Sequence, residues 1–140
     1  MHESAENYLE TILVLSLKGS PVRSIDIVNE LEYSKPSVSV AMKNLRGKGH
    51  IVIDDDGYIT LTAKGRKIAN TMYERHLAIS DLLVFLGVDT KTAVQDACKM
   101  EHDMSEKSFL AIKNHIETLK RNAEKPQGKE NQKISNRGLK

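Results

Sequence analysis

The order of structural elements is set by residues 34–61, SKPSVSVAMKNLRGKGHIVIDDDGYITL. Ser34 is a preferred helix N-cap, and Pro36 lies in the first helical turn, where its missing N–H costs nothing. Apolar side chains then recur with helical spacing until a glycine ends the pattern. Two β-prone runs, 51–53 and 58–61, follow, and Asp-Asp-Asp-Gly between them is a strong turn signal. The segment therefore predicts a helix that leads into a two-stranded hairpin.

Helical patterns flank this segment on both sides. The short helix before it is expected to begin with a Ser24 N-cap and to bury Ile25, Val28 and Leu31. Turn residues such as Lys-Gly-Ser-Pro separate the helical runs from one another. The helices expected from spacing and capping residues are 4–17, 24–31, 34–46, 62–86, 90–104 and 105–121.

The order helix, helix, helix, hairpin, helix is that of a winged helix-turn-helix. The fold class expected is therefore mainly α, with a winged helix-turn-helix DNA-binding domain. The same order also arises in unrelated small domains, so the chemistry of the exposed residues has to support the assignment.

Composition limits the other possibilities. The chain has 140 residues and a formal net charge of +2, so any nucleic-acid binding depends on where the charges are placed. Its single cysteine excludes an internal disulfide framework and fits a reducing compartment. The first ten residues lack a signal peptide's basic and apolar regions, and no apolar run is long enough to span a bilayer. A cytoplasmic protein without membrane contact is expected.

A local basic patch occurs within this nearly neutral chain. Residues 33–53 contain lysines and an arginine but no acidic residue, as binding to backbone phosphates requires. If Val38, Ala41, Met42 and Leu45 face the core, hydroxyls and one valine face outward, where they can meet base edges and thymine methyl groups. The alternative is a polar helix face with an incidental valine. The predicted DNA-binding residues are Ser34, Lys35, Pro36, Ser37, Ser39, Val40, Lys43 and Arg46.

Metal-binding groups interrupt the apolar stripes of three predicted helices. Cys98, Glu101 and His102 are spaced i, i+3 and i+4, so they are expected to converge on one patch. A carboxylate in an apolar stripe is costly unless it is paired or bound to a cation. The first helix and the long helix add further polar groups with the same potential. The candidate ligands are Asn7, Glu10, His76, Cys98, Glu101 and His102.

Carboxylate, imidazole and amide oxygen with one sulfur suit a first-row divalent metal rather than calcium or a structural zinc finger. A thiolate at Cys98 favours iron(II), with manganese(II) second, but this preference weakens if Cys98 binds only through its carbonyl. Each residue also has an ordinary alternative. His76 can be a hydrogen-bonded core histidine and Cys98 a small buried hydrophobe, while Asn7 can be solvated or capping and Glu10 can pair with a lysine.

Several stretches resemble the diphtheria-toxin-repressor family of iron- and manganese-dependent regulators. The matching stretches are ENYLETI at 6–12, SKPSVS at 34–39, LTAKG at 61–65, RH at 75–76 and ACKMEHDMS at 97–105. The resemblance implies a winged-helix DNA-binding domain over 1–72 and a helical metal-binding and dimerisation domain over 73–121. A basic tail over 122–140 is expected to be disordered.

The resemblance also implies a function. A homodimer would bind palindromic double-stranded operators and repress metal-uptake genes when metal occupies a site between the two domains. Carried over position by position, the metal ligands are the six candidates named above. Asn7 departs from both branches, since iron-type members have Met there and manganese-type members have Asp. Cys98 follows the iron type and Glu10 the manganese type.

Three rival interpretations remain open at this stage. The first is a metal-independent winged-helix regulator that responds to a small ligand, and the second is a metalloenzyme that uses the same cluster for hydrolysis. The third is a dimerisation or scaffold module, which leaves the acid-free basic stretch unexplained. We expect no enzyme and no small-molecule substrate, because the candidate ligands can fill a coordination shell and the sequence shows no nucleophile motif or phosphate-binding glycine loop.

Overall fold

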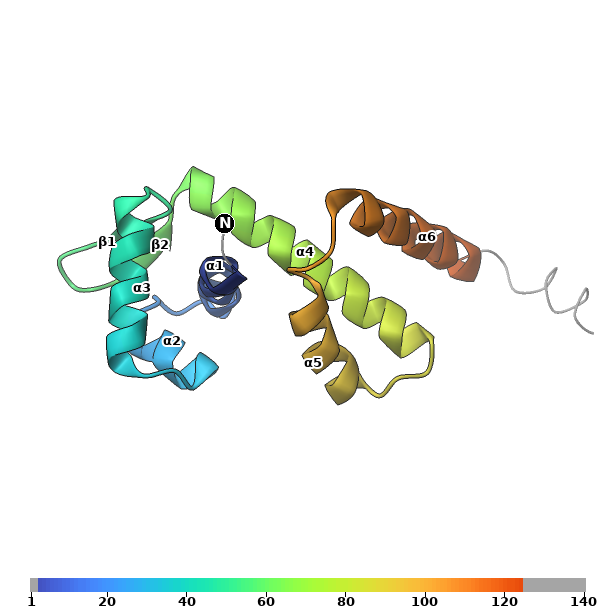
Figure 1. Cartoon of the computed structure of the whole chain (residues 1–140), viewed down its shortest axis with the longest axis horizontal. Coiled ribbons are helices and arrows are strands. Elements are labelled where there is room, and N and C mark those ends of the chain that lie inside the picture. The colour runs from blue at the N-terminus through green and yellow to red at the C-terminus, as the bar shows by residue number, and fades with distance from the viewer. Residues whose placement is uncertain (1–2, 125–140) are drawn as a thin grey trace, which may run out of the picture. The chain divides into compact units, whose positions relative to one another are not determined.

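A computed structural model describes residues 3–124 of the chain as six helices and one two-stranded sheet (Figure 1). The expectation of a mainly α fold with a winged helix-turn-helix order is confirmed. The elements are α1 (Glu3–Ser16), α2 (Ser24–Leu31), α3 (Lys35–Gly47), β1 (Ile51–Ile53), β2 (Ile59–Leu61), α4 (Ala63–Phe85), α5 (Thr90–Met100) and α6 (Glu106–Glu124).

The third helix begins as its sequence predicts. The Ser34 hydroxyl accepts a hydrogen bond from the backbone N–H of Ser37 at 3.2 Å, which satisfies one of the free donors of the first turn. Val38, Met42 and Leu45 are buried on one side of the helix and join the core with Leu9 of α1. The expected inward face of α3 is therefore confirmed.

The second helix buries a different residue from the one expected. Its N-cap is Arg23, whose backbone N–H donates to the Asp26 carboxylate at 2.8 Å, and Ser24 is already helical. Ile27 is fully buried, whereas Ile25 is 43% exposed. The prediction for Ile25 was wrong because apolar residues crowd this short helix, and spacing alone does not select its buried side.

The hairpin forms the wing. Strands β1 and β2 pair antiparallel, with Val52 opposite Thr60, and the N–H of Ile59 also donates to the Val22 carbonyl at 2.7 Å. At the tip, an Asp54 carboxylate oxygen accepts hydrogen bonds from two backbone N–H groups at 2.9 Å, and Gly57 adopts a φ of 82°. These features stabilise the turn that the Asp-Asp-Asp-Gly sequence predicts.

The long helix α4 connects the wing to the remaining helices of the first compact unit, and it packs against α1 and α5. Its first turn approaches the loop after α3 closely. The Thr62 hydroxyl caps α4 by accepting from the Gly65 N–H, and it donates to the Gly49 carbonyl at 2.7 Å. Gly65 lies directly against the His50 backbone carbonyl, so this position has no room for a side chain.

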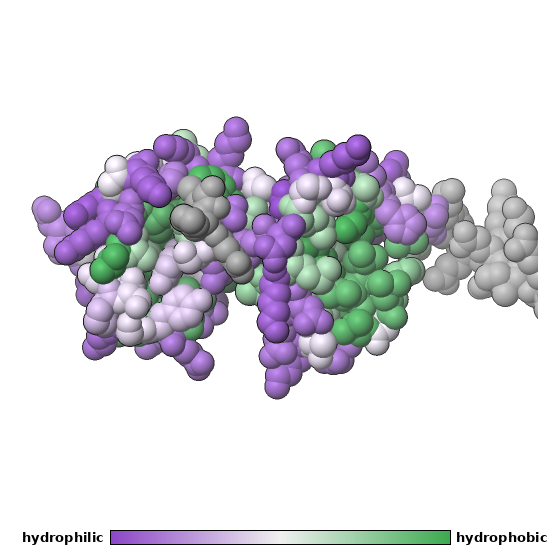
Figure 2. All heavy atoms as spheres, viewed as in Figure 1, coloured by the Kyte–Doolittle hydropathy of each residue, from purple (hydrophilic) through white to green (hydrophobic). Residues whose placement is uncertain are grey.

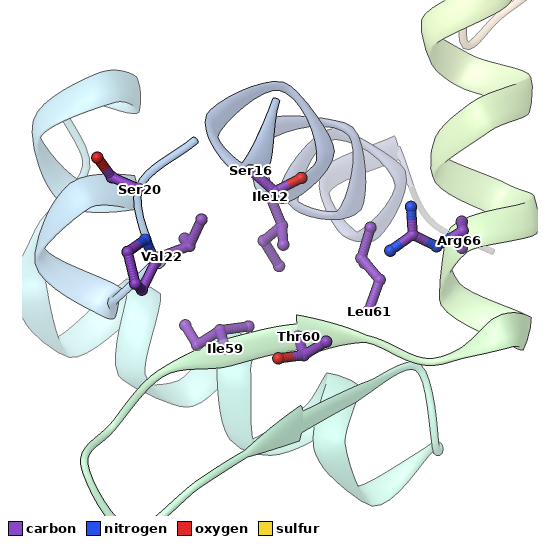
Figure 3. A pocket seen from close by; sticks show the side chains of 9 residues that line it. Ile12, Ser16, Ser20, Val22, Ile59, Thr60, Leu61 and Arg66 are labelled. Carbon is purple, nitrogen blue, oxygen red and sulfur yellow. The ribbon is translucent and has the colours of Figure 1, made fainter. Parts of the chain in front are cut away.

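A small pocket of about 170 Å³ lies between α1, β2 and the start of α4. Figure 3 shows Ile12 of α1 directed toward the same space as Ile59 and Leu61 of β2. Drug-sized ligands usually occupy about 300–1,000 Å³, so this pocket offers little room for a small-molecule effector.

The helix α5 ends earlier than expected. It stops at Met100, Glu101 is its C-cap, and residues 101–105 form turns rather than a continued helix. The Arg75 guanidinium donates from Nη1 to the Glu101 carbonyl at 3.0 Å, which satisfies a carbonyl at the C-terminus of the helix. A buried side chain from another element therefore ends α5, and helical spacing could not predict this.

The described residues form one compact unit that ends at Asp103 and a second that begins at Met104 and contains α6. Helix α6 continues to Glu124, three residues beyond its predicted end. The rest of the predicted tail, 125–140, lies outside the described residues. No helix within 3–124 combines the length and the hydropathy needed to cross a bilayer.

Candidate functional site

The buried side of α5 directs Glu101 into the protein. Ala93 and Ala97 are fully buried, and Glu101 follows them with the same spacing of four residues and is also fully buried. Cys98 is exposed to solvent beside this buried stripe. The expected convergence of Cys98 with Glu101 and His102 is therefore not seen, because the stripe that faces the core is offset by one residue from the predicted one.

Three helical elements bring carboxylates and an imidazole together. Glu10 comes from α1, His76 from α4 and Glu101 from the end of α5, and one potential ligand atom from each lies within 4.8 Å of the others. His76 Nδ1 is 3.1 Å from Glu101 Oε2. Glu10 is 7% exposed and Glu101 is 0% exposed, so these two carboxyl groups lie almost entirely away from water.

His102 extends this cluster on its other side. Its side chain is 2% exposed, and its Nε2 lies 3.3 Å from Glu101 Oε1. Its other nitrogen, Nδ1, lies 3.4 Å from Glu6 Oε1 on α1. Four of the six predicted ligands, Glu10, His76, Glu101 and His102, are thus gathered in one buried cluster.

The electrostatics of this cluster favour a positive charge or a shared proton. Burial, followed by the neighbouring Glu101 carboxyl group, raises the pKa of Glu10 to about 8. Within residues 3–124, Glu10 Oε2, Glu101 Oε1 and His102 Nε2 are buried without a hydrogen-bond partner, although the last two atoms are close to each other. Unpaired buried acceptors are unfavourable, so three of them facing one another fit the coordination of a cation.

The donor set also fits a particular class of cation. Two carboxylates and two imidazoles are ligands that first-row divalent metals such as iron(II) and manganese(II) accept. Calcium takes oxygen ligands rather than imidazole nitrogen, and a structural zinc site uses cysteines and histidines at close spacing.

Asn7 lies on α1 between Glu6 and Glu10 and is half-buried. Its backbone carbonyl accepts a hydrogen bond from the Thr11 hydroxyl at 2.8 Å. Nothing in the described geometry brings its side chain into the Glu10–Glu101 cluster, so its role as a ligand stays a prediction.

Two residues of this region were not predicted as functional. Arg75 is buried and holds the Glu101 carbonyl, and Glu6 contacts His102. The spacing of Glu6, one helical turn before Glu10, was a usable signal, because residues four apart share a helix face. Arg75 gave no such signal, since its partner depends on where α5 ends.

The exposed side of α3 presents the predicted DNA-binding residues. All eight of these side chains are exposed, and Val40 is 59% exposed on a helix that otherwise buries its aliphatic residues. Asn44, which the sequence analysis missed, follows Val40 by one turn and is also exposed. Its spacing from Ser37 and Val40 was the available signal, and an asparagine amide can pair with adenine in the major groove.

An open groove of about 470 Å³ runs between this side of α3 and the N-terminal turns of α1. The residues that line it are Ser4, Tyr8, Pro36, Ser37, Val40, Ala41 and Asn44. The recognition surface is therefore continuous with the helix that carries Glu6 and Glu10.

Exposed apolar side chains gather on the helices of the metal cluster. Figure 2 shows such side chains around the C-terminal half of α4, where Phe85 and Leu86 are 66% and 67% exposed. A surface of this kind is typical of an interaction site in a water-soluble protein. We use the name apolar patch for the exposed large apolar side chains of α4 and α5, which are Leu77, Val84, Phe85, Leu86, Val94 and Met100.

Two protein-family models match the chain and together cover most of it. Residues 1–59 match the N-terminal DNA-binding domain of the iron-dependent repressors. Residues 62–132 match the metal-binding and dimerisation domain of the same repressors.

Individual relatives agree with these matches. The chain is 34% identical over 122 residues to an uncharacterised helix-turn-helix-type transcriptional regulator of Methanocaldococcus jannaschii, covering 86% of this chain and 98% of that protein. It is 33% identical to the transcriptional regulator MntR of Escherichia coli, covering 79% of this chain and 72% of that protein. It is 32% identical to the diphtheria toxin repressor of Corynebacterium diphtheriae, covering 74% of this chain and 46% of that protein.

Solved structures share the fold. A manganese-dependent transcriptional repressor in complex with manganese superposes with a TM-score of 0.73 and 26% identity, over 79% of this chain and 51% of that chain. The metal-dependent transcriptional regulator MtsR gives a TM-score of 0.74 and 25% identity, over 81% of this chain and 53% of that chain. This chain thus spans about half the length of both proteins.

Proposed function

The chain belongs to the family of iron-dependent repressors, which are DNA-binding regulators rather than enzymes, and we propose that it represses transcription only when a divalent metal is bound. The observation that carries this proposal is the buried cluster of Glu10, His76, Glu101 and His102, with three acceptor atoms that lack hydrogen-bond partners. Two deeply buried carboxyl groups beside each other are energetically unfavourable unless a cation compensates their charge, which supports a repressor that uses metal.

The ligands are arranged so that metal binding can affect DNA binding. Glu10 lies on α1, and the neighbouring residues Leu9 and Ile12 pack in the same core as Val38 of α3. The other ligands come from α4 and α5. Glu10, His76 and Glu101 would hold the cation, and its charge would keep α1 against α4 and α5. Because α1 also contacts α3, the orientation of the recognition helix is fixed with it.

The proposed cofactor is iron(II), with manganese(II) as a second activating ion. The exposed position of Cys98 removes a buried thiolate as the reason for preferring iron. The general affinity order still places iron(II) above manganese(II) at a site of oxygen and nitrogen ligands, although the difference is small enough for both ions to load the site. Asn7 and Cys98 complete the proposed ligand set, Cys98 through its backbone carbonyl.

The proposed assembly is a homodimer in the cytoplasm that binds a palindromic operator of metal-uptake genes. The apolar patch on α4 and α5 supplies a surface that a second copy can cover. In a two-fold dimer the two α3 helices have to enter successive major grooves, about 34 Å apart along the DNA. A metal that fixes α1, and through it α3, selects the protomer conformation that meets this spacing.

The test is DNA-binding anisotropy under anaerobic conditions with iron(II), with manganese(II) and with a chelator. The DNA fragments come from upstream of the protein's own gene and of neighbouring metal-transport genes. We expect binding with either ion and none with chelator. Equal binding in all three conditions would refute the metal switch.

The matched variant is Glu101→Ala, which removes the carboxylate at the centre of the cluster. We expect it to fold and to dimerise, as seen by circular dichroism and size-exclusion chromatography, but to lose the response of DNA binding to metal. A Glu101→Ala protein that still responds to metal would show that the cluster is not the sensor.

A further inference from the structure

We propose that Glu6 is a positioning residue for the metal site, which holds the His102 ring so that Nε2 faces the Glu10–Glu101 cluster. The inference rests on the proposed function, because it assigns a role to Glu6 at the same site. Glu6 is not one of the predicted ligands, and its contact is with the ring nitrogen of His102 that points away from the cluster.

Glu6 shares one face of α1 with Glu10. It lies on α1 four residues before Glu10, so both carboxylates project from the same face of the helix. The two carboxylates have different partners, since Glu10 meets Glu101 and His76 while Glu6 meets His102. The Glu6 side chain is 19% exposed, so it keeps some contact with water.

The two ring nitrogens of His102 face different carboxylates. Its Nδ1 lies 3.4 Å from Glu6 Oε1, and a carboxylate accepts hydrogen bonds, so the tautomer with its hydrogen on Nδ1 satisfies this contact and leaves the Nε2 lone pair available for a metal. The opposite nitrogen, Nε2, lies 3.3 Å from Glu101 Oε1 and has no hydrogen-bond partner among the residues that the structure describes. The Glu6 contact therefore selects the ring orientation that presents Nε2 to the cluster.

The backbone does not fix this orientation of the His102 ring. His102 lies beyond the end of α5, within the turns at 101–105, so no continuous helix fixes the direction of its side chain. Its ring needs a partner to choose between its two nitrogens. Partners that orient metal-binding histidines in this way typically change metal affinity by about 10–100-fold when they are removed.

The experiment compares Glu6→Ala with Glu6→Gln in the full chain. The glutamine keeps a side-chain oxygen that can accept from Nδ1 but removes the charge, whereas the alanine removes both. Manganese(II) affinity is measured by electron paramagnetic resonance of the free ion. We expect Glu6→Ala to weaken binding about 10–100-fold and Glu6→Gln to restore most of the loss.

Two controls separate the possible failures. Glu30→Ala removes an exposed carboxylate from α2 and should leave manganese affinity unchanged. Glu101→Ala should abolish binding. If the wild-type chain binds no manganese(II), or Glu101→Ala binds normally, the proposed function fails. If Glu101→Ala loses binding while Glu6→Ala keeps wild-type affinity, only the role of Glu6 is overturned.

A spectroscopic readout tests the orientation itself. In the zinc(II)-loaded protein, nitrogen-15 NMR of the histidine side chains should show a slowly exchanging Nδ1–H for His102 in the wild type and in Glu6→Gln. This signal should exchange faster with water in Glu6→Ala. Equal loss of affinity in the alanine and glutamine variants, with an unchanged Nδ1–H signal, would show that the charge of Glu6 matters and that its hydrogen bond does not.

Discussion

His50 is a buried histidine whose charged form the fold opposes. It is 3% exposed, and burial, followed by the positive charges of Lys64 and Lys48, lowers its pKa below the ordinary value of 6.5. The folded protein therefore binds fewer protons than the unfolded chain in mildly acidic solution. This residue lies in the turn between α3 and β1, so its protonation acts on the DNA-binding elements.

The consequence is a pH-dependent stability with a defined sign. The contribution of His50 to the free energy of unfolding should be largest above pH 6.5 and should fall as the pH drops below that value, until it levels off below the folded-state pKa of His50. In the metal-free protein the raised pKa of Glu10 acts in the opposite direction over the same range, so the His50 contribution is the difference between the wild type and a His50 variant. Urea titrations of the metal-free protein between pH 5 and 8 measure this slope. The stability advantage of the wild type over His50→Gln should shrink as the pH falls from 7 to 5, whereas His115→Gln, at an exposed position on α6, should follow the wild type at every pH.

At the scale of elements, Gly65 shows how closely α4 approaches the loop after α3. A Cβ at this position would overlap the backbone carbonyl oxygen of His50, which is not a flexible group. Gly65→Ala should therefore lower the free energy of unfolding by about 2–3 kcal/mol. Gly47→Ala is the control, because that helical position is open and alanine there should raise stability by up to about 1 kcal/mol. Chemical denaturation of both variants measures the difference, and equal stabilities would contradict the close approach.

The wing carries a charge that opposes DNA binding. Asp55 and Asp56 are exposed at its tip, and β1 begins only a few residues after the recognition helix α3 ends. Neutralising both, as Asp55→Asn with Asp56→Asn, should strengthen DNA binding by up to about 1 kcal/mol per charge at low salt.

Lys43→Ala on α3 should act in the opposite direction. It should weaken DNA binding and lower the number of ions released on binding, which the salt slope reports, by about one. Anisotropy titrations at several salt concentrations measure both effects, and an unchanged slope for Lys43→Ala would argue against a phosphate contact.

The sequence predicted the elements that depend on local signals and missed the features that depend on distant partners. Ser34 with Pro36, and the Asp-Asp-Asp-Gly turn, act within a few residues, so α3 and the wing were placed correctly. The end of α5 depends on a hydrogen bond between Arg75 and Glu101 across 26 positions of the chain. Because that end was missed, the contact of Glu6 with His102 was not foreseen, and the exposure of Cys98 was missed because the buried stripe of α5 is offset by one residue.

At the scale of the whole molecule, metal binding and operator binding are expected to favour the same conformation of the protein. If metal strengthens DNA binding by a given factor, thermodynamic linkage requires operator DNA to strengthen metal binding by the same factor. Manganese(II) affinity measured with and without operator DNA tests this equality against the anisotropy data. DNA of unrelated sequence is the control and should give a smaller change in metal affinity. If operator DNA leaves the metal affinity of the wild type unchanged, the coupling is refuted.

The helix α1 contributes both to the core under the recognition helix and to the metal cluster. This double role limits how the protein can evolve. Leu9 and Ile12 build the core under the recognition helix, while Glu6 and Glu10 reach the metal cluster from the same helix. A recombination event that joined residues 1–59 to the metal-binding segment of another repressor would separate Glu10 from the His76 and Glu101 with which it is matched. New metal preferences should therefore arise by point substitution within one lineage, rather than by exchange of a sensor module between lineages.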